Sequence, residues 1–155
     1  MTKTMFGALH YAANLTVEFV RLLPNPYVGQ LIQGFNRDVS QLLAHLAQIP
    51  REEMLLMQGY KKQQIMQSLR KTVAEAGEFQ SLLMESINDL ERFVVGREQT
   101  DVLRNANGTA LIIEEWCLET LMHFCHHRAQ ILSHLAASTI IVPRGLLKEL
   151  FVGHL

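Results

Sequence analysis

Apolar side chains recur every three or four residues along most of this chain, which is the spacing of one face of an α-helix. Four long helices are expected, over residues 2–23, 36–58, 61–86 and 109–137. No segment shows a convincing alternation of apolar and polar residues that would indicate a strand. The pattern therefore predicts an all-α fold, a four-helix bundle, whose unequal connectors allow at least one crossover.

Prolines and small polar residues indicate where these helices begin and end. Pro24 and Pro26 are expected to end the first helix, and Asn36 or Asp38 can cap the second. Pro50 falls inside the second helix, where its ring clashes with the carbonyl four residues earlier. A kink or a restart of the helix is therefore expected at Pro50.

The last two connections carry weaker signals. Residues 87–108 lose the helical period and contain Asn107-Gly108, so we expect a connector that holds a short turn of helix or strand. Thr109 is expected to cap the fourth helix. A short additional C-terminal helix is expected to begin near Pro143.

Composition narrows the classes of protein. A chain of 155 residues that is 48% hydrophobic can bury one core, so residues 1–155 are expected to form a single domain. The 14 basic and 15 acidic residues are scattered, which argues against nucleic-acid binding. The chain lacks an apolar run of about 18 residues and a signal peptide, so no membrane association and a cytoplasmic location are expected.

The histidines are the most informative residues. His123 and His127 are four apart, so their β-carbons lie about 5–6 Å apart on one helical face, where two imidazoles can converge on one ion. Trp116, Glu119 and Gln130 fall on the same stripe. If the stripe faces the interior, a metal would compensate the buried polar groups; the alternative is that it faces water.

His45 is the candidate for a third ligand. It lies in an apolar band, so its side chain should point inward, and the alternative is a core histidine hydrogen-bonded to a carbonyl. One plus two histidines leave coordination positions open, which is typical of a catalytic or ligand-binding metal. His126 lies about 60° around the helix from His123, which suits a partly exposed neighbour of the site.

The segments SQLLAHLAQ and LMHFCHHRAQILSHL resemble the DinB-like family of metal-binding four-helix bundles. That family has a histidine in the second helix and an H-x3-H motif, followed by Arg and Gln, near the end of the bundle. The resemblance implies a divalent metal, zinc, nickel or iron, on His45, His123 and His127, with Arg128 and Gln130 as the accompanying signature. It also implies a homodimer.

Similar proteins include enzymes that attach a low-molecular-weight thiol to an electrophilic small molecule. The first hypothesis is therefore a metal-dependent thiol-S-transferase, with Glu119 or His126 as proton acceptor and Trp116 or Gln130 in contact with substrate. A metal-dependent hydrolase could use the same site. The third hypothesis is a non-enzymatic bundle that acts as a metal-responsive or interaction protein.

Overall fold

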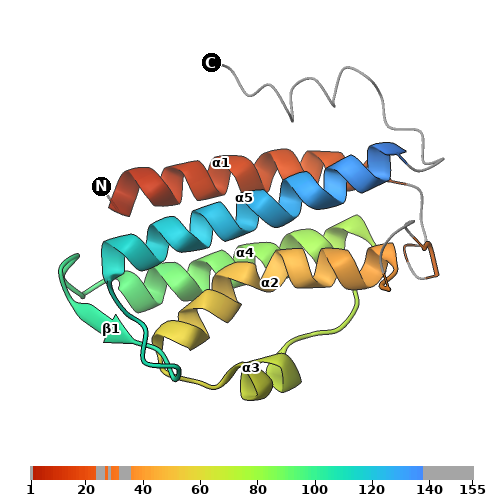
Figure 1. Ribbon diagram of the computed structural model, residues 1–155. Coiled ribbons are helices and arrows are strands. Elements are labelled where there is room, and N and C mark those ends of the chain that lie inside the picture. The colour runs from red at the N-terminus through yellow and green to blue at the C-terminus, as the bar shows by residue number, and fades with distance from the viewer. Residues whose placement is uncertain (1, 24–26, 28, 32–35, 138–155) are drawn as a thin grey trace.

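The computed structural model of the chain describes residues 2–23, 27, 29–31 and 36–137, and the side chains of all of these except 2 and 134–137 (Figure 1). Its elements in chain order are α1 (Thr2–Val20), α2 (Val39–Met57), α3 (Lys62–Ser68), α4 (Ala76–Val94), β1 (Val102–Arg104), β2 (Ala110–Ile112) and α5 (Ile113–Ala137). The fold is all-α, as predicted, with the four long helices side by side. The expected helix near Pro143 lies outside the described residues.

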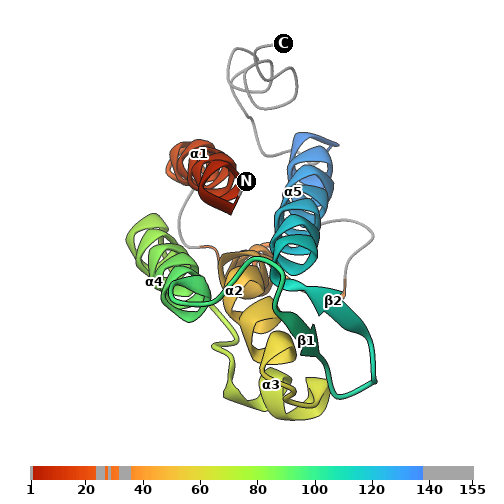
Figure 2. The same cartoon turned by 90° about the vertical axis from the view of Figure 1, so that its left-hand side faces the viewer.

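The four long helices surround a common core, and the end-on view shows their order (Figure 2). Helix α1 packs against α4 and α5, and α2 packs against the same two helices. Helices that follow one another, α1 and α2 or α4 and α5, therefore lie diagonally across the bundle. The bundle is therefore not a plain up-and-down one, in line with the crossover that the unequal connectors allow.

Each long helix contributes large apolar side chains to this core. Phe19, Leu43, Ile87 and Phe124, one from each helix, are fully buried. Burying side chains of this size contributes about 1.5–3 kcal/mol each. The apolar stripes of the sequence thus account for how the helices assemble. None of the helices among the described residues is long and apolar enough to cross a membrane.

The first turn of α2 is fixed by the expected cap. Asp38 Oδ1 accepts a hydrogen bond from Gln41 N at 2.9 Å, and Gln41 Oε1 accepts one from Asp38 N at 3.1 Å. This reciprocal pair satisfies two backbone donors that have no partner within the helix. The helix then runs through Pro50 to Met57, so of the kink or restart expected at Pro50 the restart does not occur.

Pro50 bends α2 without breaking it, and the change of direction is visible in Figure 1. A proline inside a helix disturbs the backbone hydrogen bonds around it. Here α4 provides a partner, because Arg51 N donates to Ser86 Oγ at 2.8 Å. The bent second half of α2 carries two carboxylates, Glu52 and Glu53, which become important at the candidate site.

The prediction of one helix over residues 61–86 is wrong. Helix α3 ends at Ser68, an extended segment follows, and α4 begins at Ala76. Ile65, Leu69 and Val73 are buried, as the apolar stripe implied. The spacing of apolar residues therefore identified the buried side chains but not the backbone conformation between them.

The reason for this break lies in α2. Arg70 N donates to Gln48 Oε1 at 2.9 Å, and Val73 N donates to Ser40 Oγ at 3.1 Å. These backbone groups bond to side chains of another helix rather than to carbonyls one turn earlier. A tertiary interaction has thus replaced helix propensity along this segment.

The connector before α5 is a β-hairpin. Strands β1 and β2 pair antiparallel with Val102 opposite Ile112, and Gly108 in the turn has φ 87°, a left-handed value that suits glycine. The expected cap at Thr109 is wrong, because its carbonyl accepts a hydrogen bond from Asn105 N within the hairpin. Strand pairing takes up residues 110–112, so α5 begins only at Ile113.

Candidate metal centre

Three histidines from two helices meet between α2 and α5. His45 comes from the middle of α2, and His123 and His127 lie one turn apart on α5. The ring centroids of His45 and His127 are 4.9 Å apart, those of His123 and His127 4.8 Å, and those of His45 and His123 6.5 Å. One ligand nitrogen from each ring lies within 4.8 Å of the other two. The structure therefore brings the predicted triad together.

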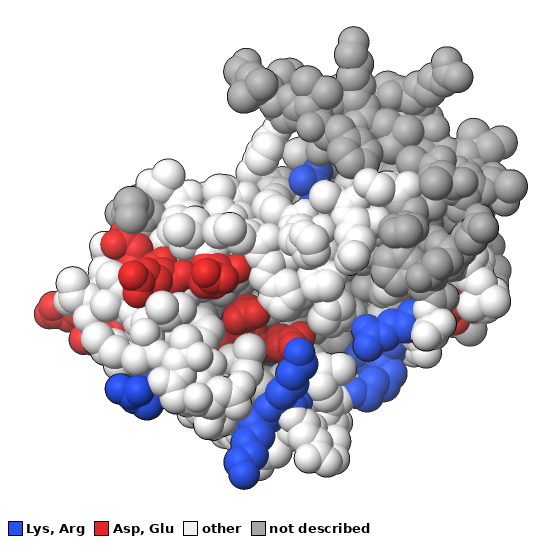
Figure 3. All heavy atoms as spheres, in the orientation of Figure 1, with Lys and Arg blue, Asp and Glu red and all other residues white. Residues whose placement is uncertain are grey.

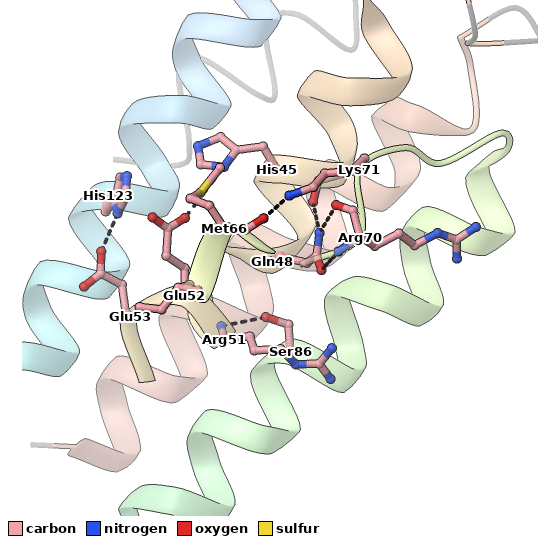
Figure 4. A network of polar contacts seen from close by, with 12 residues as sticks. His45, Gln48, Arg51, Glu52, Glu53, Met66, Arg70, Lys71, Ser86 and His123 are labelled. Atoms are coloured by element: carbon pink, nitrogen blue, oxygen red, sulfur yellow. Dashed lines mark hydrogen bonds and ion pairs between the residues drawn. The ribbon is translucent and has the colours of Figure 1, made fainter. Parts of the chain in front are cut away.

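Glu53 holds the imidazole of His123. Its Oε1 accepts a hydrogen bond from His123 Nδ1 at 2.6 Å, and the carboxylate is buried (Figure 4). This bond is the main reason why the pKa of His123 is raised. With the proton on Nδ1, the Nε2 lone pair remains available, which is how carboxylates orient metal-binding histidines.

Glu52 is the second carboxylate behind the triad. Only 4% of the residue is exposed, and its Oε2 lies 3.7 Å from His45 Nδ1. Among the described residues this oxygen has no hydrogen-bond partner. Burial raises the pKa of Glu52, and the neighbouring Glu53 adds to the effect. A buried carboxylate beside an imidazole and without a hydrogen bond is expensive unless a cation compensates it.

The other two imidazoles are set to remain neutral. Burial, followed by repulsion from His127 and Arg37, lowers the pKa of His45 to about 4. Burial, followed by repulsion from His123, lowers the pKa of His127. Neutral imidazole is the form that binds a metal ion. Two of the three rings are therefore ready to act as ligands at neutral pH.

These residues fit a divalent metal. Three imidazoles with further coordination positions left open are a known ligand set of zinc, and here one nitrogen from each ring lies within 4.8 Å of the other two. Imidazoles suit zinc, nickel and iron alike, and the donors do not distinguish between these ions. The unsatisfied oxygen of Glu52 supports the fit, because a cation at the triad would balance its charge.

A comparison with protein-family models and a comparison with curated proteins each found no match. Among solved structures, the chain is similar to a candidate member of the DinB family from Exiguobacterium sibiricum 255-15. The TM-score is 0.70 at 20% sequence identity, over 91% of this chain and 95% of that chain. The chain has a DinB-like fold. The resemblance noted in the two histidine segments is thus confirmed for the fold.

The triad of this DinB-like bundle lies in the wall of a cavity of about 380 Å³. This volume is in the range of small-molecule sites. Besides the three histidines, the lining includes Glu52, Gln130 and the cationic side chains Arg37 and Lys62. Small molecules of a few non-hydrogen atoms could therefore reach an ion at the triad.

Gln130 is the one further residue of the predicted stripe that lies at the site. It lines the cavity together with His127. The exposed His126 has its ring centroid 5.4 Å from that of His127 and lines no part of the cavity. Arg128 is half-buried.

Trp116 and Glu119 do not line the cavity. Trp116 is buried, and its Nε1 has no hydrogen-bond partner among the described residues, whereas Glu119 is exposed. Both share the angular position of His123, but Trp116 lies about 10 Å further along the helix axis. A helical projection gives direction around the axis and ignores this separation.

The sequence contains a signal for Glu52 and Glu53, the two carboxylates at the site that were not predicted to be site residues. Glu52 and Glu53 follow His45 by seven and eight residues, about two helical turns, and therefore share its face. A restart of the helix at Pro50 would have placed both residues in a first helical turn. Because α2 continues through the proline, the same residues lie behind the triad instead.

Proposed function

We propose that this DinB-like protein binds a divalent ion through His45, His123 and His127 and transfers a low-molecular-weight thiol to an electrophilic small molecule. One observation carries the proposal: three imidazoles converge on the wall of a cavity, with two buried carboxylates behind them. A structural site would be closed by protein ligands, whereas this one faces open volume.

The reaction has a simple balance. The thiol loses its proton, its sulfur forms a bond to the electrophilic carbon, and the leaving group departs with the electron pair of the broken bond. A divalent ion at the triad would favour the thiolate form at neutral pH.

The residues of the chain divide the remaining tasks. Glu53 orients His123. Glu52 is the proton acceptor that we favour, because it lines the cavity and has a free carboxylate oxygen. Gln130 is placed to contact substrate beside His127. Glu119 and His126 stay predictions for the proton acceptor, and Trp116 for a substrate contact.

The first test is the metal content of the purified protein by elemental analysis. We expect near-stoichiometric zinc, nickel or iron in the parent and none in His123→Ala/His127→Ala, with folding checked by circular dichroism. His10→Ala is the matched control, because His10 pairs with Glu91 away from the triad and should keep the metal. Equal metal in the parent and the double variant would refute the site.

The second test is turnover by the metal-loaded protein with a panel of thiols and an aryl halide or epoxide. Conjugation that needs both the thiol and the metal would support the transferase. Hydrolysis of an ester or lactone without thiol would favour the hydrolase, in which Glu52 would take a proton from water. No turnover over the whole panel, with the metal bound, would favour the non-enzymatic alternative.

A further inference from the structure

Two cationic side chains line the same cavity as the triad. Arg37 immediately precedes the cap of α2, and Lys62 is the first residue of α3. Both are exposed, and neither forms an ion pair or hydrogen bond with the described residues. By contrast, Arg51 pairs with Asp89 and Arg70 with Glu78.

Basic and acidic side chains lie close together on one face of the molecule. Figure 3 shows basic side chains over the region of α2 and α3, beside carboxylates near the centre of the same face. Arg37 and Lys62 line the same cavity as Glu52 and the three histidines. The two cations are thus close enough to the triad to act on whatever occupies the cavity.

A count of charges indicates the charge of the ligand that the cavity would bind best. With Glu52 and Glu53 ionised, the charges of these two carboxylates, of Arg37 and Lys62 and of a divalent ion at the triad would add up to a net charge of +2. A thiolate neutralises one of these two positive charges, and one further negative group on the ligand neutralises the other.

We propose that Arg37 and Lys62 bind a carboxylate of the thiol substrate, so that the substrate is an acidic low-molecular-weight thiol. This inference rests on the proposed function. A carboxylate suits the count because it carries one charge, and it suits the residues because a guanidinium and an ammonium are its usual partners. The two cations select the substrate, and the triad holds its sulfur.

The test compares two thiols that differ only in charge. The protein is loaded with Co²⁺, and binding of 3-mercaptopropionate and of its uncharged amide is followed by the sulfur-to-cobalt absorbance. We expect the parent to bind the acid about fivefold to tenfold more tightly than the amide, and less so at high salt. Arg37→Gln/Lys62→Gln should bind both thiols equally.

Lys61→Gln is the matched control. Lys61 is the exposed neighbour of Lys62 and does not line the cavity. The substitution Lys61→Gln removes the same charge as Lys62→Gln. This variant should keep the preference for the acid. An equal affinity of the parent for the two thiols, or a preference that survives in the double variant, would overturn the inference.

Failure of the metal site itself would look different. If the protein takes up no cobalt, or neither thiol changes the spectrum, then the proposed function fails. The two cations are then tested in the metal-free protein by following the side-chain ¹⁵N resonances of Arg37 and Lys62 while 3-mercaptopropionate is added. Shifts that the amide does not cause would support a carboxylate site, and no shift would reject it.

Discussion

Helix α2 carries buried and half-buried polar side chains on two faces, and only one of the faces provides them all with partners. Toward α4 and the segment before it lie Ser40, Gln48 and Arg51. Toward α5 lie His45, Glu52 and Glu53. Figure 4 shows Gln48 and Arg51 of the first set and the three residues of the second set around the same helix. We refer to them as the closed face and the open face.

On the closed face the hydrogen bonds are complete within the chain. Gln48 Nε2 donates to Ala44 O and Arg70 O, both at 2.8 Å, and its Oε1 accepts from Arg70 N at 2.9 Å. Arg51 Nε donates to Asp89 Oδ2 at 2.9 Å. Buried polar groups with such partners hold a fold in one arrangement.

On the open face the chain does not complete the set. Glu52 keeps an oxygen without a hydrogen bond, and the triad nitrogens point into one region. This difference indicates which buried polar residues stabilise the fold and which are available to bind a ligand. Burial alone would not separate Gln48 from Glu52, because both are almost fully covered.

The largest effect should come from metal on the open face. A ligand that binds only the folded state stabilises it by about 4 kcal/mol at a free concentration a thousand times its Kd. For a chain of this length that corresponds to a rise in Tm of roughly 10 °C. Differential scanning fluorimetry with and without added Zn²⁺ measures it. His123→Ala/His127→Ala should show no rise, and an equal rise in that variant would place the metal elsewhere.

The next largest effect should come from removing hydrogen bonds on the closed face. Gln48→Ala removes three hydrogen bonds and leaves the backbone of Arg70 without its partner. We expect a loss of about 2–3 kcal/mol in the free energy of unfolding, measured by urea denaturation. Metal affinity should change little, because the hydrogen bonds of Gln48 go to Ala44 and Arg70 and not to the histidines. A large loss of metal affinity in a folded Gln48→Ala would show that the two faces are not independent.

A smaller effect is expected from removing the charge of Glu53 on the open face. Glu53→Gln keeps the shape and a hydrogen-bond acceptor for His123 Nδ1 but removes the charge. We expect metal affinity to fall about tenfold, at the lower end of the usual effect of such residues, as measured by competition with a chelator. Glu119→Gln is the control, because Glu119 is exposed and away from the cavity, and it should have no effect. Equal effects of the two variants would remove Glu53 from the site.

The same two faces show what the sequence could predict. The triad followed from local spacing, since His123 and His127 are four apart and His45 sits in an apolar band. Burial and helix periods are properties of short windows, so the four stripes also emerged. The capping box at Asp38 is local in the same sense.

What could not be predicted depends on contacts between distant residues. The break between α3 and α4 exists because Gln48 and Ser40, more than 20 residues away, accept the backbone N–H groups of Arg70 and Val73. The short hairpin strands cover too few residues to show a period. Arg37 and Lys62 meet at the cavity only because α3 packs on α2.

The smallest effect concerns pH at the edge of the closed face. Glu78 accepts hydrogen bonds from Ala74 N at 2.7 Å and from Arg70 at 2.8 Å, and these bonds lower the pKa of its carboxyl below the ordinary 4.5. A carboxyl with a lowered folded pKa stabilises the protein above its unfolded pKa, and this contribution is lost as the pH falls through the folded value.

We therefore expect the urea midpoint of the metal-free protein to fall less steeply between pH 4.5 and 3 in Glu78→Gln than in the parent. The effect should be small because Glu78 is near the surface, where solvent screens its charge. Glu98→Gln is the control, because Glu98 is exposed and forms no ion pair with the described residues, and the urea midpoint of this variant should depend on pH as that of the parent does. Identical profiles for the parent and Glu78→Gln would mean that this carboxyl does not help to hold the segment that bonds to Gln48.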